Sequence, residues 1–411
     1  MARVLMLKCV LCGRTYRERE VDYTCPHCGM DGTLDVLYDY DEIKKHFTRE
    51  CLEKSRDFTQ WRYRDILPVN DETNIQPLEV GFTPLYDSGV LAREYGAKKV
   101  YIKDDGRNPT ASLKDRASAV GVARALDYGK NTIACSSTGN AASSMAGFAA
   151  VAGLKSFIFV PESAPEAKVA QLLIYGATVV LVKGNYEDAF NLSTAAIYKF
   201  GWYNRNCGIN PYLVEGKKTC GLEIAEQLGW EAPDRIFIAV GDGCCISGLY
   251  KAFYDLKALG FIDRMPKLVG VQAAGSSPIY HAFKYHLPKV EFVKPDTLAD
   301  SIAVGAPRNW AKALRAVRQT AGDMVTVTDE EILEAMKELA RKTGVFGEPA
   351  GVTGFAGFKK MAKERYIGMD ERIAIVVTGN GLKDIASARK AVAKPILVEP
   401  DINELLKRIC C

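Results

Sequence analysis

Four of the twelve cysteines stand at a spacing that suits a metal ion. Cys9 and Cys12 form one CxxC pair, Cys25 and Cys28 form a second pair after twelve intervening residues, and a glycine follows each pair. Two such pairs supply four thiolates in a tetrahedron, which is a closed structural zinc site without an open position for water. The sequence therefore predicts a Zn²⁺ ribbon over residues 1–40. Four unrelated core cysteines, or redox chemistry at one CxxC pair, are the alternative interpretations.

Lys114 is a candidate for covalent chemistry. It follows a strand predicted at 100–102 and a loop rich in Pro, Ser and Thr, and it stands at the start of a helix predicted from Asp115 to Gly129. The positive end of a helix opposes an ammonium ion there, so a neutral amine or an imine is favoured. Such a lysine suits Schiff-base formation with a carbonyl compound. On this feature alone, an ordinary surface lysine is the simpler interpretation.

Two loops after predicted strands could bind anions. Ser136, Ser137 and Thr138 precede Gly139 and Asn140 at a helix start, where hydroxyls and backbone amides suit a carboxylate. Helix capping explains one of these hydroxyls but not the whole run. The second loop can cradle a phosphate with its backbone amides, although a tight strand–helix turn also explains its glycines and the charge of its aspartate counts against an anion. That loop comprises Gly241, Asp242, Gly243, Cys244 and Cys245.

Thr378 follows another predicted strand, and its hydroxyl could face a ring nitrogen or cap the next helix. Each of these features is ambiguous alone. Together they describe one pocket with an imine lysine, a carboxylate loop, a phosphate loop and a neutral hydroxyl.

The elements that must position these residues alternate between strand and helix. Short apolar runs suit buried parallel strands, and the segments between them have helical spacing. Such alternation predicts an α/β fold with mostly parallel sheets, in which ligands bind beyond the carboxyl ends of the strands. The predicted strands are 100–102, 132–135, 156–160, 177–182, 235–240, 267–272 and 372–377, and the further predicted helices include 141–152, 165–175 and 186–200.

Length and composition limit the class of protein. A chain of 411 residues with 48% hydrophobic residues can bury a large core. A net charge of +4 gives no support to nucleic-acid binding through charge alone. No apolar run reaches the ~18 residues of a membrane span, and no secretory leader is evident. We therefore expect a cytoplasmic protein that binds neither membrane nor nucleic acid.

Taken together, the motifs resemble those of the fold-type II pyridoxal-phosphate enzymes, and among them the threonine synthases. The resemblance spans roughly residues 60–390, and some members of that family carry a similar N-terminal ribbon. The resembling motifs are Trp61–Arg64 with Leu67–Pro68, Gly81–Leu85, Asn108–Arg116, Ser136–Asn140, Gly347–Ala350 and Thr378–Asp384.

The resemblance implies roles for single residues. Lys114 would hold pyridoxal 5'-phosphate as an imine, and Asn140 would contact the ring hydroxyl. Ser137 and Thr138, with Ser136, would bind the substrate carboxylate, and the loop 241–245 would bind the cofactor phosphate. Thr378 would meet the pyridine nitrogen; such a hydroxyl partner goes with elimination and replacement chemistry in this family.

The resemblance also implies an architecture. It predicts two three-layer αβα domains of the tryptophan synthase β type after the zinc ribbon, assembled as a homodimer. The predicted divisions are 1–40 for the ribbon, 41–133 with 206–400 for a large cofactor-binding domain, 134–205 for a smaller mobile domain, and 401–411 for a C-terminal tail.

The chain departs from the family pattern at several positions. Leu213 stands where threonine synthases usually have an arginine that pairs with the substrate's phosphate, Gly208 where a serine is frequent, and Asn380 where a histidine is usual. Losing a guanidinium partner for a phosphate costs several kcal/mol, at about 1.5–3 kcal/mol per charged hydrogen bond. The cations that could substitute are Arg205, Lys217 and Lys218.

Three functions follow from these observations. The first is a threonine synthase-like lyase that converts O-phosphohomoserine and water to threonine and phosphate. The second is a β-elimination or β-replacement on another small amino acid, as in serine/threonine dehydratase or cysteate synthase. The third is a non-enzymatic protein that uses its ribbon for binding.

Overall fold

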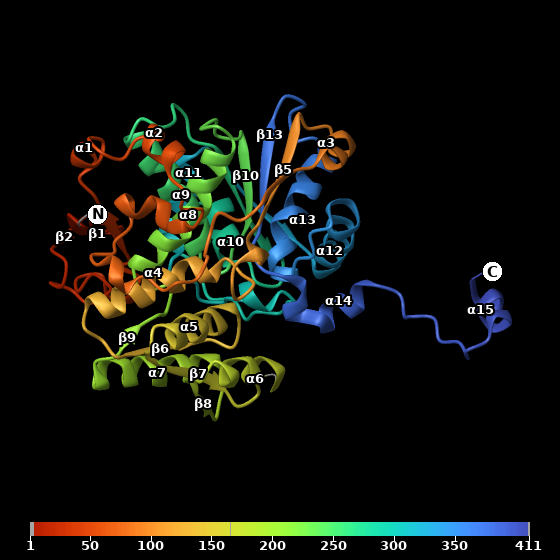
Figure 1. Cartoon of the computed structure of the whole chain (residues 1–411), viewed down its shortest axis with the longest axis horizontal. Coiled ribbons are helices and arrows are strands. Elements are labelled where there is room, and N and C mark those ends of the chain that lie inside the picture. Colours follow the sequence, from red (N-terminus) through yellow and green to blue (C-terminus); the bar gives the residue numbers. More distant parts are fainter. Residues whose placement is uncertain (1–3, 165, 410–411) are drawn as a thin grey trace.

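The structure is a computed structural model that describes residues 4–164 and 166–409. Its strands form a small antiparallel sheet near the N-terminus, a large mixed sheet and a smaller parallel sheet (Figure 1). The predicted α/β class with mostly parallel strands is confirmed. No helix among the described residues is long and apolar enough to cross a lipid bilayer.

The N-terminal sheet has the strand order β2-β1-β3, with antiparallel pairs only. Tyr16 lies on a strand as predicted, but Tyr23 lies in an irregular segment. There its hydroxyl accepts a hydrogen bond of 3.1 Å from the backbone N–H of Asn204, far along the chain. The elements of this region are β1 (Met6–Cys9), β2 (Thr15–Tyr16), β3 (Leu34–Leu37), α1 (Tyr40–Ile43), α2 (Arg49–Lys54) and the 3₁₀ helix η2 (Gln60–Ile66).

The large sheet has the order β12-β11-β10-β13-β5-β4, and only the edge strand β4 runs antiparallel. Ile236 and Ile238 of β10 pack into one apolar core, while Phe237 and Ala239 pack into a second core on the other face. Burial on both faces explains why the inner strands appear as continuous apolar runs in the sequence. The strands are β4 (Leu85–Asp87), β5 (Lys99–Asp104), β10 (Arg235–Ala239), β11 (Lys267–Ala273), β12 (Asp323–Val327) and β13 (Arg372–Val377).

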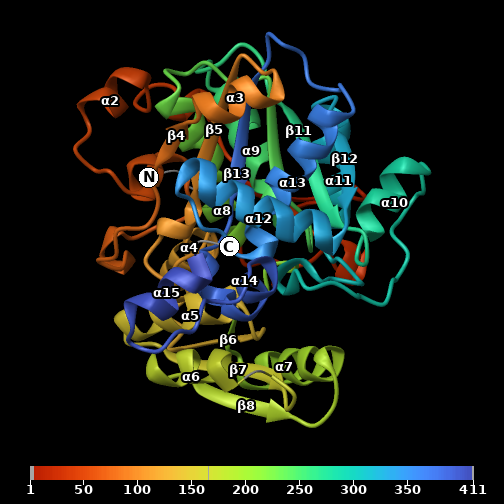
Figure 2. The ribbon, with the colours of Figure 1, turned by 90° about the vertical axis from the view of Figure 1, so that its right-hand side faces the viewer.

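Helices cover both faces of the large sheet (Figure 2). The core on one face includes side chains from α4, α8, α9 and α11, and the other core includes side chains from α3, α12 and α13. The bounds of these and the adjoining helices are α3 (Gly89–Tyr95), α4 (Lys114–Asp127), α8 (Tyr212–Gln227), α9 (Cys244–Ala258), α10 (Pro278–Lys284), α11 (Trp310–Gln319), α12 (Asp329–Thr343) and α13 (Pro349–Lys363).

The smaller sheet is entirely parallel, in the order β8-β7-β6-β9. Its elements agree with the sequence predictions to within two residues, except that the two-residue strand β9 was not predicted. The sheet runs from residue 132 to residue 204, close to the predicted small domain at 134–205, whose limits and mobility stay a prediction. Its elements are β6 (Thr132–Ser136), α5 (Asn140–Val151), β7 (Lys155–Pro161), α6 (Glu166–Ile174), β8 (Thr178–Val182), α7 (Tyr186–Phe200) and β9 (Tyr203–Asn204).

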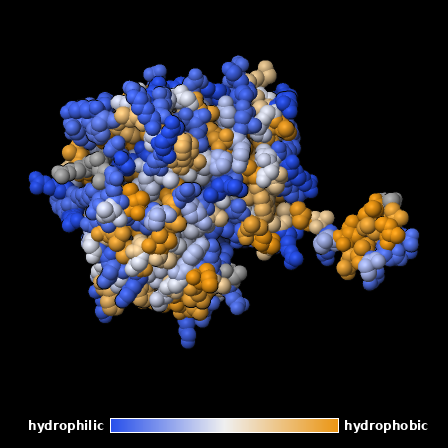
Figure 3. Space-filling view, viewed as in Figure 1, coloured by the Kyte–Doolittle hydropathy of each residue, from blue (hydrophilic) through white to orange (hydrophobic). Residues whose placement is uncertain are grey.

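The C-terminal segment leaves the body of the molecule after α14 (Ile385–Ala391). An extended stretch leads to a separate helix, α15 (Ile402–Ile409), in the region predicted only as a tail (Figure 1). Apolar side chains cover much of this helix in the space-filling view, and Ile402 and Ile409 are 64% and 55% exposed (Figure 3).

Candidate active site

Three of the predicted site loops meet at one edge of the large sheet. They follow β5, β10 and β13, which are neighbours in that sheet, so their carboxyl ends lie together. The loops after β5 and β13 are also joined directly: the backbone N–H of Leu113 donates to the Thr378 carbonyl at 2.9 Å, and Ser112 forms a bridge with Gly379.

Lys114 is the first residue of α4, as predicted, and it is half-buried. Its Nζ lies 3.8 Å from Sγ of Cys245, so the predicted imine lysine and the predicted phosphate loop are neighbours. No side chain caps the N-terminus of α4. Ala111, three residues earlier, has a φ of 65°, a left-handed conformation that favours glycine. The chain accepts this strain in the turn that leads into Lys114.

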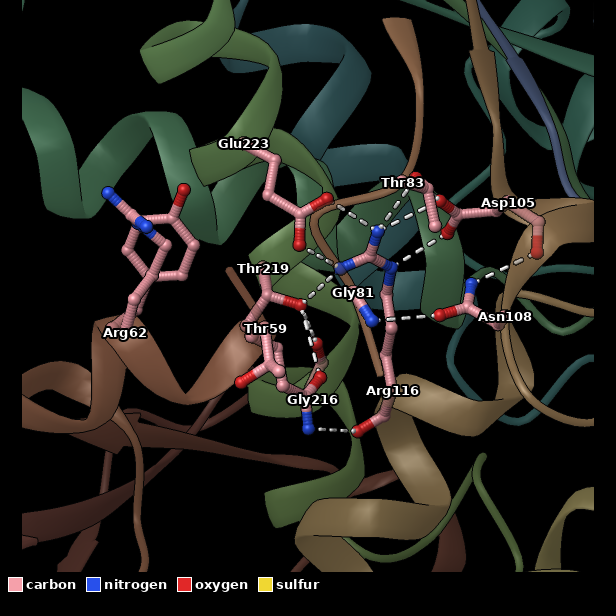
Figure 4. A network of polar contacts seen from close by, with 12 residues as sticks. Thr59, Arg62, Gly81, Thr83, Asp105, Asn108, Arg116, Gly216, Thr219 and Glu223 are labelled. Carbon is pink, nitrogen blue, oxygen red and sulfur yellow. Dashed lines mark hydrogen bonds and ion pairs between the residues drawn. The ribbon is translucent and has the colours of Figure 1, made fainter. Parts of the chain in front are cut away.

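The guanidinium of Arg116 connects the start of α4 to Asp105 and to Glu223 (Figure 4). Its guanidinium is fully buried and contacts Asp105 through Nε at 2.7 Å and Nη2 at 2.8 Å, and Glu223 of α8 through Nη2 at 2.7 Å. Thr219 accepts a further hydrogen bond of 2.8 Å. Opposite charges on both sides of one guanidinium satisfy it without water. The sequence placed Arg116 in a motif but gave it no role.

The loop at the N-terminus of α9 has the form of a phosphate cradle. Gly243 has a φ of 95°, and no side chain caps the helix. A Cβ on Gly241 would lie 3.0 Å from the Cα of Ile302, so a side chain has no room there. The Asp242 carboxylate, which counted against an anion, accepts the backbone N–H of Arg308 at 3.0 Å instead. The free amide end of the helix therefore fits a phosphate group.

The hydroxyl run begins with Ser136, the last residue of β6, and leads to the N-terminus of α5, which also lacks a side-chain cap. Ser137 Oγ accepts a hydrogen bond of 3.2 Å from the Gly139 N–H, so one hydroxyl of the run is bonded within its own loop. Ser136 is buried, and its Oγ has no hydrogen-bond partner within the described residues. Thr138 and Asn140 line a small cavity of about 40 Å³ between the two larger sheets.

Glu348 is a site residue that sequence reasoning missed. It lines the same cavity, and its Oε1 accepts a hydrogen bond of 2.6 Å from Nδ2 of Asn140. Burial raises the pKa of the Glu348 carboxyl to about 7, although Lys383 and Asn140 oppose that shift. Burial likewise lowers the pKa of Lys383, whose Nζ donates to Ser143 Oγ at 3.1 Å. The Gly347–Ala350 motif contained this glutamate, but its burial depends on contacts distant in sequence.

Residues from the segments around the smaller sheet and from those around the large sheet line the cavity. Lys114 and Thr378 do not line this cavity. Their loops are joined by the hydrogen bond from the Leu113 N–H to the Thr378 carbonyl. The other lining residues are Gly139, Ser143, Lys168, Gln171, Asp300, Ser301, Pro349, Ala350, Lys383 and Asp384.

Thr378 is half-buried at the end of β13. Its backbone N–H donates to the Gly351 carbonyl at 3.4 Å. The 3₁₀ helix η6 (Gly381–Asp384) is capped by Asn380, and α14 by Asp384. The capping interpretation of Thr378 is therefore wrong, and its hydroxyl is not needed for that purpose.

Leu213 does not point to any anion site. It is fully buried, and a Cβ on Gly121 of α4 would lie 2.6 Å from its Cδ2. Two of the cations that could substitute for the missing arginine contact other groups. Arg205 donates to Ser118 Oγ at 2.9 Å, and Lys218 pairs with Asp255 at 2.7 Å.

The four ribbon cysteines come together as predicted. Their sulfur atoms all lie within 4.8 Å of one another, with Cys12 and Cys25 3.7 Å apart. Tyr16 contacts Cys25 Sγ at 3.0 Å. Four converging thiol groups are compatible with a tetrahedral metal ion.

Comparisons with known proteins identify the family of the chain. A family model described as pyridoxal-phosphate dependent enzyme matches residues 77–379. A threonine synthase of Methanocaldococcus jannaschii is 43% identical, covering 98% of this chain and 99% of that protein. A threonine synthase of Methanosarcina acetivorans is 42% identical, covering 98% of both.

Solved structures show the same fold at low identity. Diaminopropionate ammonia lyase from Escherichia coli superposes with a TM-score of 0.68 at 18% identity, over 82% of this chain and 93% of that one. Threonine deaminase isoform 2 from Solanum lycopersicum gives 0.65 at 20% identity, over 86% and 93%. With the family match and the full-length relatives, these findings show that the chain belongs to the pyridoxal-phosphate dependent enzyme family.

Proposed function

We propose that this chain is a threonine synthase, a lyase that converts O-phosphohomoserine and water into threonine and phosphate with pyridoxal 5'-phosphate. The observation that carries the proposal is the contact between Lys114 Nζ and Cys245 at 3.8 Å. It joins an amine that can form an imine to a phosphate cradle, within a chain whose full-length relatives are named threonine synthases.

The residues of this chain would hold the cofactor and move protons. The loop 241–245 binds its phosphate through backbone amides, Asn140 donates to its ring hydroxyl, and Thr378 meets its pyridine nitrogen. The bound cofactor supplies an electron sink for carbanions of the substrate. Lys114 transfers protons at the α and β carbons of the substrate. The hydroxyl run Ser136–Thr138 binds the substrate carboxylate.

A second reaction is favoured by one specific observation. Leu213 is buried against Gly121, and no guanidinium is available at this position for a phosphate leaving group. The alternative is β-elimination or β-replacement on another small amino acid with the same cofactor.

One assay separates the two reactions. The purified chain is supplied with O-phosphohomoserine, serine and threonine in turn, and phosphate, threonine and keto acids are measured. A threonine synthase forms threonine and phosphate in equal amounts from O-phosphohomoserine. Keto acid formed from serine or threonine supports the alternative if O-phosphohomoserine releases no phosphate. A Lys114→Ala variant is the control and should lose either activity.

The proposal includes a structural Zn²⁺ at the four ribbon cysteines and a homodimer. The dimer is supported by the apolar side chains of α15, because its own chain leaves Ile402, Leu406 and Ile409 exposed. A chain truncated after Val392, which lacks the extended stretch and α15, should be monomeric by light scattering if α15 joins two copies. A dimer that is unchanged by the truncation would contradict this role of α15.

A further inference from the structure

Lys217 differs from the other buried lysines of the described residues. Six lysines are at most 8% exposed, and five of them lie within 4.0 Å of a carboxylate. Lys217, on α8, is 2% exposed and has no carboxylate within that distance in the part of the chain that is described. Burying an ammonium ion is costly unless it is paired, and no carboxylate of the described residues pairs with this one, so an anionic ligand would stabilise it. The five paired lysines are Lys103, Lys218, Lys251, Lys312 and Lys359.

The side chain of Lys217 faces the start of α9. Gly248 leaves room for its stem, since a Cβ on that glycine would lie 2.9 Å from the Lys217 Cβ. The groups that dominate its electrostatic surroundings are the thiols of Cys207, Cys245 and Cys244. Cys245 is also the residue that contacts Lys114 Nζ. The buried cation therefore lies beside the cradle and close to the imine lysine.

Cysteines, and not carboxylates, are the groups that act on the Lys217 ammonium. Burial lowers the pKa of Lys217, but Cys207, Cys245 and Cys244 outweigh it and raise that pKa above its ordinary value. A hydrogen bond from Cys244 and the charge of Lys217 in turn hold the pKa of Cys207 well below its usual range. Cys207 also forms a side-chain hydrogen bond with Lys217, and Cys244 is the first residue of α9, whose N-terminus has no side-chain cap. A dianion placed there meets a full positive charge and free backbone amides together.

We propose that the ammonium of Lys217 is the cationic partner of a ligand phosphate held at the N-terminus of α9. Lys217 follows Leu213 by four residues on α8, but Leu213 packs against Gly121 of α4 whereas Lys217 packs against Gly248 of α9. The proposed cation therefore reaches the phosphate from another position than the arginine usual at position 213. The inference rests on the proposed function, which brings phosphate into the site on the cofactor and on the substrate.

The test uses the full-length chain with Lys217→Gln, and with Lys217→Met as a second neutral variant that suits a buried site. Lys217→Arg retains the charge, and Lys257→Gln on the exposed side of α9 is the matched control. After the cofactor is removed with hydroxylamine, pyridoxal 5'-phosphate and pyridoxal, which lacks the phosphate, are titrated by absorbance. Inorganic phosphate is then titrated against the cofactor-loaded chains.

The two titrations distinguish the two sources of phosphate. We expect a neutral variant to bind pyridoxal as the unaltered chain does, and to lose about ten- to a hundredfold in affinity for a phosphate-bearing ligand. A loss confined to pyridoxal 5'-phosphate assigns Lys217 to the cofactor. A loss confined to inorganic phosphate assigns it to the substrate's phosphate. Lys217→Arg should recover most of either loss.

Two results would overturn the inference. If the neutral variants match Lys257→Gln with all three ligands, Lys217 does not pair with a phosphate. If they lose pyridoxal and pyridoxal 5'-phosphate equally, the residue acts only through packing. An unaltered chain that binds no pyridoxal 5'-phosphate would instead refute the proposed function itself.

Discussion

The side chain of Glu348 determines which way the Asn140 amide points. Its Oε1 accepts one of the two Nδ2 hydrogens at 2.6 Å, so the second N–H and the amide oxygen are left for other partners in the cavity. Glu348 therefore acts as a positioning residue for the amide that is proposed to meet the cofactor. Its ionisation is also coupled to the charge of Lys383.

Glu348→Gln should change how stability depends on pH. The carboxyl has a folded pKa of about 7 against an ordinary value of 4.5, because it is buried. The folded chain then holds a proton between these values that the unfolded chain releases, so its stability falls as pH rises from about 4.5 to about 7. The shift is worth roughly 3 kcal/mol. The variant keeps an acceptor for Asn140 and lacks this fall.

The measurement is the thermal midpoint of both cofactor-free chains between pH 4.5 and pH 8. The unaltered chain should lose stability relative to the variant across this window, and the difference should be constant above pH 7. Parallel curves would mean that folding does not raise the pKa of the Glu348 carboxyl.

Residue types and spacing predicted much of the site but not all of it. Lys114 and the loop 241–245 could be predicted because they follow buried strands, and the ends of parallel strands converge. Glu348 could not, because its burial depends on Asn140 and Lys383 from distant segments. The orientation of Lys217 was likewise open, since the sequence could not show which face of α8 meets α9.

At the scale of elements, α4 depends on charges that reach it from other segments. Arg116, two residues after Lys114, is held by Asp105 after β5 and by Glu223 of α8 (Figure 4). Since all three are fully buried, the position of the lysine is coupled to the packing of α4 against α8.

Arg116→Met should be strongly destabilising. It leaves the carboxylates of Asp105 and Glu223 buried with one fewer cation, and breaking such a pair typically costs about 3–5 kcal/mol. Differential scanning calorimetry should show a clear fall in the thermal midpoint. Arg64→Met is the matched control, because the Arg64–Glu72 pair is about half exposed and such pairs contribute ~0–1 kcal/mol. Equal midpoints for the two variants would contradict this role of Arg116.

Element boundaries were predicted well for helices that bury one face and for strands that are buried on both faces. The helix at 186–200 and the strand at 372–377 match the structure, because a regular apolar pattern defines them. β4 and the two-residue β9 could not be predicted, because short edge strands carry no such pattern. α15 was not predicted, although Ile402, Leu405, Leu406 and Ile409 have helical spacing.

At the scale of the whole molecule, the ribbon is attached to the catalytic body by side chains rather than by its linker alone. Asp35 of β3 pairs with Arg315 of α11 at 2.5 Å, and Asp31 accepts from the Trp310 indole at 3.3 Å. Tyr23 accepts from the backbone of Asn204, next to Arg205, which donates to the Lys114 carbonyl at 3.4 Å. The sequence predicted the ribbon but not these contacts, because they join segments far apart in the chain.

Removal of the metal should therefore destabilise more than the ribbon. We expect one Zn²⁺ per chain by elemental analysis, with Cys28→Ser losing it and the exposed Cys51→Ser, outside the cluster, retaining it. The chain without metal should have a lower thermal midpoint and weaker binding of pyridoxal 5'-phosphate. Full zinc content in Cys28→Ser would contradict the proposed ligand set.

The account as a whole depends on a covalent bond between Lys114 and the cofactor. Borohydride reduction of the purified chain, followed by proteolysis and mass spectrometry, locates that bond. We predict a single pyridoxyl group on the peptide that contains Lys114, and none on the peptides with Lys217 or Lys383. A label on another lysine, or an unlabelled Lys114 in a chain that retains cofactor absorbance, would contradict the account.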